Sequence, residues 1–329
     1  KSPERLSVSK DQIPVRMHHT ALVKPFELLI GAYGMPRYGT IDPTVFVAVS
    51  FLIMFGAMFG DLGHGLVLIA ASPFFLRRRL KNAVRQAGTL LLYCGISSSI
   101  FGFLYGSFFG FEFASLWIKP MEDILGILRA SIFLGVAMIS IGIILNMINA
   151  IRDRDYLKAV FDKAGLIGGI IYWLAIAVVS KAFVAKSAIP PVYLYLIFSS
   201  LVLIFLYPLA EVMLKKRRAS LLEAFMESLV NILEIFMGYL ANTVSFIRVA
   251  AFALAHAGLF LAIFSLSRVS AAQGSWGSVV SWLVIIAGNL IVVCLEGLIV
   301  GIQSLRLNYY EFFSKFFISG KQEYKPLSV

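Results

Sequence analysis

The chain has 329 residues, of which 59% are hydrophobic and only 14% are charged. This balance excludes a soluble globular domain and indicates a membrane protein. The formal net charge of +11 does not by itself indicate a nucleic-acid partner, because membrane proteins collect Lys and Arg on their cytoplasmic loops. Cys94 and Cys294 lie inside apolar segments and indicate neither a disulfide framework nor a metal site.

Residues 1–42 are polar and contain several prolines and glycines, which predicts a cytoplasmic lead-in to a membrane domain. Two short apolar segments follow, separated by the turn Gly60–Gly65. We interpret this turn as local turn chemistry, in which glycines permit a tight backbone and Asp61 caps the next helix. A direct role of Asp61 or His64 in ion transport is the alternative interpretation.

Further apolar segments complete a predicted supporting bundle of six helices over residues 43–214. The six segments are 43–60, 65–76, 88–110, 130–151, 164–185 and 192–214. Residues 215–329 contain two longer segments, about 221–268 and about 275–317, followed by a cytoplasmic tail. Both exceed a hydrocarbon core of about 30 Å, so we expect them to tilt strongly or to extend beyond the bilayer.

Clusters of basic residues follow the second, sixth and eighth segments. These residues are Arg77–Arg79, Lys215–Arg218 and the lysines Lys315, Lys321 and Lys325. They fall on one side of the membrane only if the chain spans it eight times with both ends cytoplasmic. The sequence therefore predicts an all-α membrane protein with eight transmembrane helices, of which the last two are long and tilted.

Arg248 lies near the middle of the longest apolar segment, where a charge that cannot be lost costs about 2.5–3.5 kcal/mol to insert. An arginine that pairs with a neighbouring helix to fix packing is the alternative to a functional one. Other polar residues share a face of about 100° with it: Asn231, Glu234, Ser245 and His256. On the last segment, Asn289, Glu296 and Gln303 recur every seven residues, and Arg306 follows them.

These two polar stripes predict a path for ions between the last two helices. Interhelical hydrogen bonding for packing explains Asn289 or Gln303 adequately. It explains the four charged residues of the two stripes poorly. A single histidine such as His256 is more often a hydrogen-bonded packing residue of the bundle than a functional one. The charged residues near it favour a functional role.

The segment from Asn242 to Leu259 places His256, in an Ala-His-Ala context, eight residues after Arg248. It resembles the penultimate helix of the a subunit of vacuolar-type rotary ATPases, which is called subunit I in archaea and bacteria. The last helix is similar in its Glu296 and Arg306, and Met58–Gly65 resembles the first hairpin of that family. The segments Tyr33–Tyr38 and Ile41–Thr44 resemble the part that leads into the hairpin. Asn242 stands where some relatives carry a histidine.

The resemblance implies the membrane domain of a stator subunit of a rotary V/A-type ATPase, in an archaeal or bacterial cell membrane. Its partners would be a ring of proteolipid subunits (the c-ring), the surrounding lipid, and, through a cytoplasmic domain outside this chain, the peripheral stalk and soluble ATPase subunits. Two offset half-channels for H⁺ or Na⁺ would face the ring. Arg248 would release the ion from each ring carboxylate and block leakage.

Topology and spacing assign Glu234 to the inner half-channel, and Glu296 with His256 to the outer one. Ser245, Asn289, Gln303 and Arg306 complete the predicted half-channel residues. Helical spacing also puts Ser245 and Phe252 on the face of Arg248, which we expect to point at the ring.

No glycine-rich phosphate loop occurs in the sequence. We therefore expect ATP chemistry in partner subunits, and neither a cofactor, a metal nor a nucleic-acid partner for this chain. A secondary ion-coupled transporter with an intramembrane charge relay is the alternative function. Such a transporter would be expected to show matching halves or interrupted helices, which the sequence does not display.

Overall fold

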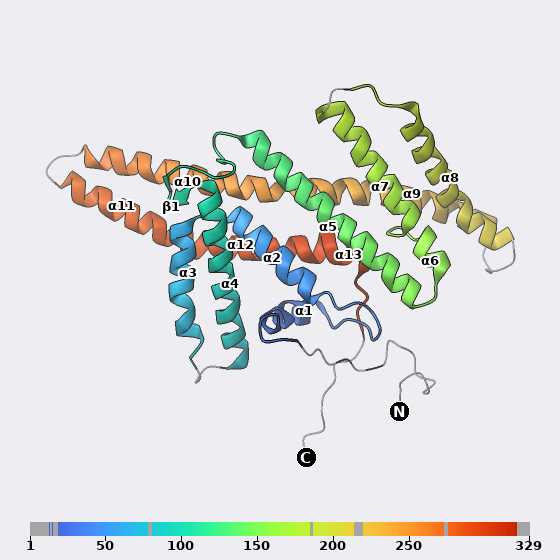
Figure 1. The fold of residues 1–329 in the computed structure, drawn as a ribbon, viewed down its shortest axis with the longest axis horizontal. Coiled ribbons are helices and arrows are strands. Elements are labelled where there is room, and N and C mark those ends of the chain that lie inside the picture. The colour runs from blue at the N-terminus through green and yellow to red at the C-terminus, as the bar shows by residue number, and fades with distance from the viewer. Residues whose placement is uncertain are drawn as a thin grey trace, which may run out of the picture.

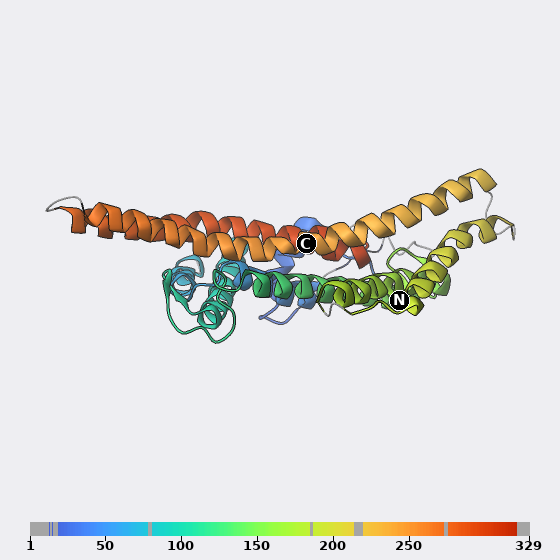
Figure 2. The ribbon, with the colours of Figure 1, turned by 90° about the horizontal axis from the view of Figure 1, so that it is seen from above.

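The computed structural model describes residues 13, 15, 19–77, 81–184, 187–213, 220–272 and 276–320. The described residues form helices in two layers, which are best separated in Figure 2. The last two long helical segments lie side by side in one layer, and the earlier helices pack against them in the other (Figures 1 and 2). Most basic residues of the predicted cytoplasmic clusters, among them Arg78 and Lys215, lie outside the described residues.

The first layer, which supports the long helices, is built from the elements up to α8. In chain order these are η3 (Lys24–Phe26, a 3₁₀ turn), α1 (Glu27–Tyr33), α2 (Thr44–Met58), α3 (Leu62–Phe75), α4 (Asn82–Tyr105), β1 (Ser107–Phe108), β2 (Phe111–Glu112), α5 (Ile124–Arg152), α6 (Tyr156–Phe161), α7 (Leu166–Val179), η4 (Ser180–Val184, a π-turn) and α8 (Pro191–Met213). The two short strands form an antiparallel pair in which Ser107 is opposite Glu112.

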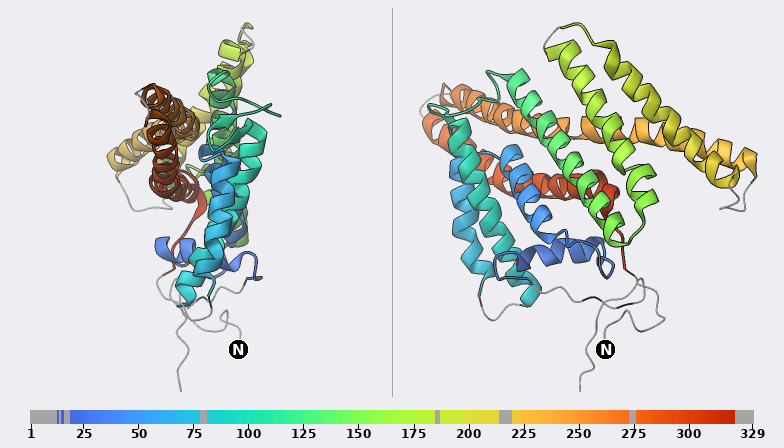
Figure 3. Two further views of the ribbon diagram at one scale, coloured as in Figure 1. Left: turned by 90° about the vertical axis from the view of Figure 1, so that its left-hand side faces the viewer. Right: turned by 45° about the vertical axis from the view of Figure 1, so that its right-hand side comes forward.

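The second layer contains the two long helical segments. Its elements are α9 (Leu221–Ser245), α10 (Ile247–Ala271), α11 (Gly277–Ile291), η5 (Val292–Glu296), α12 (Gly297–Leu307), η6 (Asn308–Phe312) and α13 (Phe313–Phe316). Both η5 and η6 are π-helical turns. In Figure 1, α10 and α11 run across α3 and α4, and the left view of Figure 3 shows the long pair nearly end-on beside that hairpin. The pair is therefore strongly inclined to α3 and α4, while its tilt in the bilayer stays a prediction.

Six helical stretches of the described chain are long and apolar enough to cross a membrane. They include the two longest, Leu221–Ala271 and Gly277–Phe316. The first two expected spans are present as shorter apolar helices of 15 and 14 residues. At about 1.5 Å per residue each is about 20 Å long, short of a core of about 30 Å. The count of eight spans and the cytoplasmic position of both ends therefore stay predictions.

Close glycine contacts fix α3 against α4 and hold the turn between α2 and α3 in place. A Cβ atom on Gly95 would lie 2.8 Å from the carbonyl oxygen of Gly65, so only glycine lets these two backbones meet. A Cβ atom on Gly102 would lie 2.8 Å from the Cα atom of Asp61 and would also strike the amide of Leu62. The turn that carries Asp61 thus rests directly on the backbone of α4.

A buried core joins the two layers. Met54, Met58 and Phe59 at the end of α2 are fully buried, as are Phe246 and Val300 from the long helices. These residues belong to one apolar cluster, and α2 packs on both α10 and α12. Burial of this surface holds the long helices on the supporting layer.

Candidate functional site

Arg248 lies in the first turn of α10, directly after the break at Phe246. Its Nη1 donates a hydrogen bond to Oε1 of Gln303 on α12, at 3.2 Å. Arg248 also interacts electrostatically with Arg306, an exposed like charge, and with the carboxylate of Glu311. We call Arg248, Gln303, Arg306 and Glu311 the arginine cluster.

Glu311 is the member of the arginine cluster that sequence reasoning missed. Its side chain is only 4% exposed, and it interacts with the hydroxyl of Ser245 and with both arginines. A seven-residue repeat counted from Asn289 would place Tyr310 on the polar stripe, but Tyr310 is 68% exposed. The π-turn η6 inserts one residue into the helix, so Glu311 takes the inward position instead.

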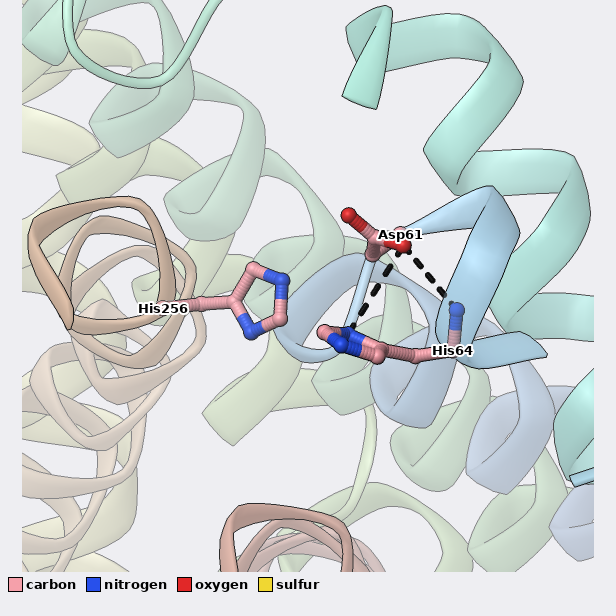
Figure 4. A group of neighbouring side chains, drawn as sticks. All are labelled: Asp61, His64 and His256. Atoms are coloured by element: carbon pink, nitrogen blue, oxygen red, sulfur yellow. Dashed lines mark hydrogen bonds and ion pairs between the residues drawn. The ribbon is translucent and has the colours of Figure 1, made fainter. Parts of the chain in front are cut away.

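A second polar group, the histidine cluster, lies farther along α10. His256 on α10 makes a hydrogen bond from Nδ1 to Oε2 of Glu296 in η5, at 2.8 Å. His64 on α3 makes a hydrogen bond from Nε2 to Oδ1 of Asn289 on α11, at 2.9 Å. Figure 4 shows His64 and His256 pointing toward one another, with Asp61 beside them. The histidine cluster consists of these five residues, and all except Asn289 are buried.

Asp61 holds several backbone groups in place at the edge of this cluster. Its Oδ1 accepts hydrogen bonds from the amides of His64, at 3.0 Å, and Phe109, at 2.9 Å. Its Oδ2 accepts from the hydroxyl of Ser107, at 2.6 Å, and from the amide of Gly110, at 2.9 Å. The predicted helix cap is therefore confirmed, and the same carboxylate also fixes the turn between β1 and β2 above His64.

A small cavity of about 40 Å³ reaches His256. It is also lined by Ser107 and Gly110, and by Glu112 and Lys119 of the segment between α4 and α5. This volume is enough for a water molecule. The hydrogen bond and charge of Glu122 raise the pKa of Lys119, which therefore stays protonated at neutral pH.

A larger polar cavity, of about 320 Å³, lies beside the second half of α9. Glu234 and Asn242 line it, together with Lys315 of the basic cluster after the last segment and with Lys163, which sequence reasoning did not single out. Glu234 is more than half exposed and forms an ion pair with Lys163. A neighbouring cavity of about 430 Å³ is lined by Asn231 and also by Lys163.

The structure thus divides the predicted site residues into three groups. Glu296 with His256, and Asn289 with His64, belong to the histidine cluster. Arg248, Gln303 and Arg306 belong to the arginine cluster, beside Ser245. Glu234 and Asn242 line the larger polar cavity. Each residue of the seven-residue stripe on the last helix forms a hydrogen bond with one ionisable side chain. Asn289 bonds His64 on α3, Glu296 bonds His256 on α10, and Gln303 bonds Arg248 at the start of α10.

Comparison with known proteins gives a family match over most of the chain. The model of the V-type ATPase 116kDa subunit family matches residues 3–121 and 209–329. A-type ATP synthase subunit I of Pyrococcus horikoshii is 27% identical over 97% of this chain and 48% of its own length. The subunit of the same name from Methanocaldococcus jannaschii is 25% identical over 97% of this chain and 50% of its own length.

A bacterial relative matches a shorter part of the chain more closely. V-type ATP synthase subunit I 2 of Treponema pallidum is 34% identical over 49% of this chain and 42% of its own length. The chain spans about half the length of these relatives.

Proposed function

The chain belongs to the V-type ATPase 116kDa subunit family, and from this premise we propose that it is the stator membrane domain of an ion-translocating rotary ATPase. In this proposal it forms two offset half-channels against a ring of proteolipid subunits. Each ring subunit carries a carboxylate that must be neutral when it faces lipid. The polar residues of this chain load and unload that carboxylate.

The outer half-channel runs through the cavity at His256. An ion enters beside Glu112 and Lys119, and reaches the hydrogen-bonded pair of His256 and Glu296. Asp61 accepts four hydrogen bonds, and through them it positions His64 and the outer turn. For protons, the buried imidazole and carboxylate provide successive sites for transfer to the ring.

The inner half-channel runs through the polar cavity lined by Glu234 and Asn242. Its volume of about 320 Å³ holds several water molecules. The ion pair with Lys163 keeps Glu234 at the wall of this cavity. From there Glu311 is the next buried acid toward the ring-facing arginine.

Arg248 separates the two half-channels. It lies eight residues before His256, which corresponds to about 12 Å along α10. Its permanent positive charge favours the ionised form of a ring carboxylate that arrives from lipid, and so drives release of the bound ion. The same charge repels a cation that would pass directly from one half-channel to the other.

The main structural support for this proposal is the position of Arg248 between a small cavity at His256 and a polar cavity at Glu234. This arrangement, with the family membership, favours the rotary subunit over a secondary transporter. Contacts with the peripheral stalk and soluble ATPase subunits are assigned in this proposal to the part of the full-length protein outside the chain.

The proposal is tested by Arg248→Ala in the full rotary complex reconstituted into vesicles. We expect ATP-driven ion uptake to be abolished while the complex stays assembled. Arg268→Ala is the matched control, because Arg268 is an exposed arginine near the end of the same helix. Uptake by Arg248→Ala at the rate of the control variant would refute the proposed mechanism.

A further inference from the structure

The interior of the histidine cluster contains electron-rich atoms without hydrogen-bond donors. Nδ1 of His64 and Nε2 of His256 are both buried and have no hydrogen-bond partner. Asp61, His64 and His256 each offer a ligand atom, and these three atoms lie within 4.8 Å of one another. Figure 4 shows the three side chains converging from the start of α3 and from α10.

The hydrogen bonds on the far side of each ring determine which nitrogen has a free lone pair. Nδ2 of Asn289 donates to the carbonyl oxygen of Ile285 at 2.9 Å, so its Oδ1 is the acceptor toward His64. Nε2 of His64 therefore carries the proton, and Nδ1 of the neutral ring has a lone pair. In the same way, the Glu296 carboxylate binds Nδ1–H of His256 and leaves the lone pair on Nε2.

Two imidazole lone pairs that face a common point repel one another unless a cation or a donor lies between them. Their surroundings strengthen this effect, because Phe59 and Phe260 stack near His64 at centroid distances of 5.6 and 5.2 Å. These aromatic rings keep the local dielectric low and water scarce.

We propose that Asp61, His64 and His256 form a binding site for a divalent transition-metal ion such as Zn²⁺. Two neutral imidazoles and one carboxylate are a common three-ligand set for zinc, with a fourth position for water or another group. Each imidazole already has the outer hydrogen-bond partner that metal-binding histidines use for orientation, Glu296 for His256 and Asn289 for His64. Nitrogen ligands favour this class of ion over Na⁺ or Ca²⁺.

The three ligand atoms need to move only slightly closer together to bind a zinc ion. Zinc–nitrogen distances of about 2.0–2.1 Å place neighbouring ligand atoms about 3.3 Å apart. Asp61 Oδ1 and His64 Nδ1 are already 3.7 Å apart, and the cavity of about 40 Å³ gives access to His256. If the proposed function holds, on which this consequence rests, the bound ion occupies the outer half-channel and blocks it.

Binding is tested directly on the purified full complex, after chelation and dialysis against Zn²⁺. We expect His64→Gln and His256→Gln each to lose one tightly bound Zn²⁺ per copy of this chain. His19→Gln is the matched control, because His19 lies near the surface, far from the cluster in sequence, and should keep the full stoichiometry. Equal Zn²⁺ content in all four proteins would overturn the proposal.

Glu296→Gln is the second variant for testing Zn²⁺ binding if the histidine variants do not assemble into the complex. Loss of this outer partner should weaken Zn²⁺ binding about 10- to 100-fold at unchanged stoichiometry, and an unchanged affinity would count against the site. Zn²⁺ enclosed in the lumen of reconstituted vesicles, onto which the outer half-channel opens when ATP drives uptake from outside, should inhibit ion uptake, and a chelator enclosed with it should restore uptake. Bound Zn²⁺ without inhibition supports the metal site and rejects its place in the outer half-channel. If the complex transports ions normally but binds no Zn²⁺ at these residues, the metal site is rejected and the proposed function is not.

Discussion

Glu311 is the residue on which the charge balance of the arginine cluster depends. Arg248 and Arg306 repel each other, and the buried carboxylate of Glu311 attracts both. Under the proposed function, this buried acid beside two guanidinium groups orients Arg248 toward the ring and passes an ion to the inner half-channel. Both roles require its negative charge.

Neutralising Glu311 should therefore impair transport strongly. For Glu311→Gln we expect ATP-driven uptake to fall at least about tenfold, because loss of one charge-assisted contact costs about 1.5–3 kcal/mol. Glu223→Gln is the control, since Glu223 belongs to the capping box of α9 and glutamine preserves that cap. Uptake of Glu311→Gln within twofold of this control would show that the carboxylate is dispensable.

At the scale of single elements, the turn between α2 and α3 shows how the backbone positions the histidine cluster. The turn rests on Gly102 of α4, and Asp61 fixes it to the β1–β2 turn through hydrogen bonds to Phe109 and Gly110. His64 follows within the first turn of α3. A small displacement of the turn would therefore move the imidazole away from its partner Asn289.

Gly102→Ala tests this dependence. The added Cβ atom would lie 2.8 Å from the Cα atom of Asp61, and neither backbone can yield easily. We expect a loss of about 1–3 kcal/mol in the free energy of unfolding, measured as a lower thermal midpoint in detergent, together with slower transport. Gly31→Ala is the control, because its Cβ atom would meet nothing within 4 Å. Equal midpoints for the two variants would mean that the turn adjusts without cost.

His19 connects two parts of the segment that precedes α2. Its ring bonds Glu27 at the start of α1, at 2.7 Å, and Asp42 just before α2, at 2.6 Å. Burial lowers the pKa of His19, but the hydrogen bonds and charges of the two acids outweigh this effect. The pKa therefore lies above its ordinary value of 6.5.

A raised histidine pKa stabilises the folded lead-in when the ring is protonated. This contribution is complete below about pH 6.5 and is lost as the pH rises through the raised pKa. We expect hydrogen exchange of the amides in residues 19–42, corrected for intrinsic rates, to show less protection at pH 8.5 than at pH 6. His19→Gln should remove the pH dependence. If the pH dependence persists in His19→Gln, another titratable group causes it.

At the scale of the whole molecule, sequence reasoning reached the helical class, the order of the apolar segments and the polar stripes. Those features follow from local periodicity and composition. The pairing of His64 with Asn289 depends on long-range packing, so no local pattern could indicate it. The π-turn that brings Glu311 inward has no reliable sequence signal. Lys163 was missed because a lysine in a short loop is ordinarily solvated.

The burial of α10 residues near Arg248 guides the choice of positions that test the proposed ring contact. Spacing alone put Phe252 on the face of Arg248, and this stays a prediction, although Phe252 is partly buried against the core. Ala251 and Ala255, three and seven residues after Arg248, are exposed on α10, which belongs to the long-helix layer. Figure 2 shows that no other described helix covers one side of this layer. Small, exposed side chains let another helix approach closely.

We therefore expect the ring to contact α10 through this small-residue face. After the native Cys94 and Cys294 are replaced by alanine, single cysteines at Ala251 and Ala255 should form disulfides with cysteines on the outer surface of the ring.

The control positions are Phe133 and Ile144 on α5, which are also exposed but belong to the supporting layer. Cysteines there should not cross-link, although they are as accessible as those on α10. Cross-linking from α5 instead of α10 would mean that the supporting layer faces the rotor. Arg248 would then lie away from the ring carboxylates, and its charge could not drive ion release. The outcome therefore decides whether the proposed ion path and the proposed rotor face can belong to one mechanism.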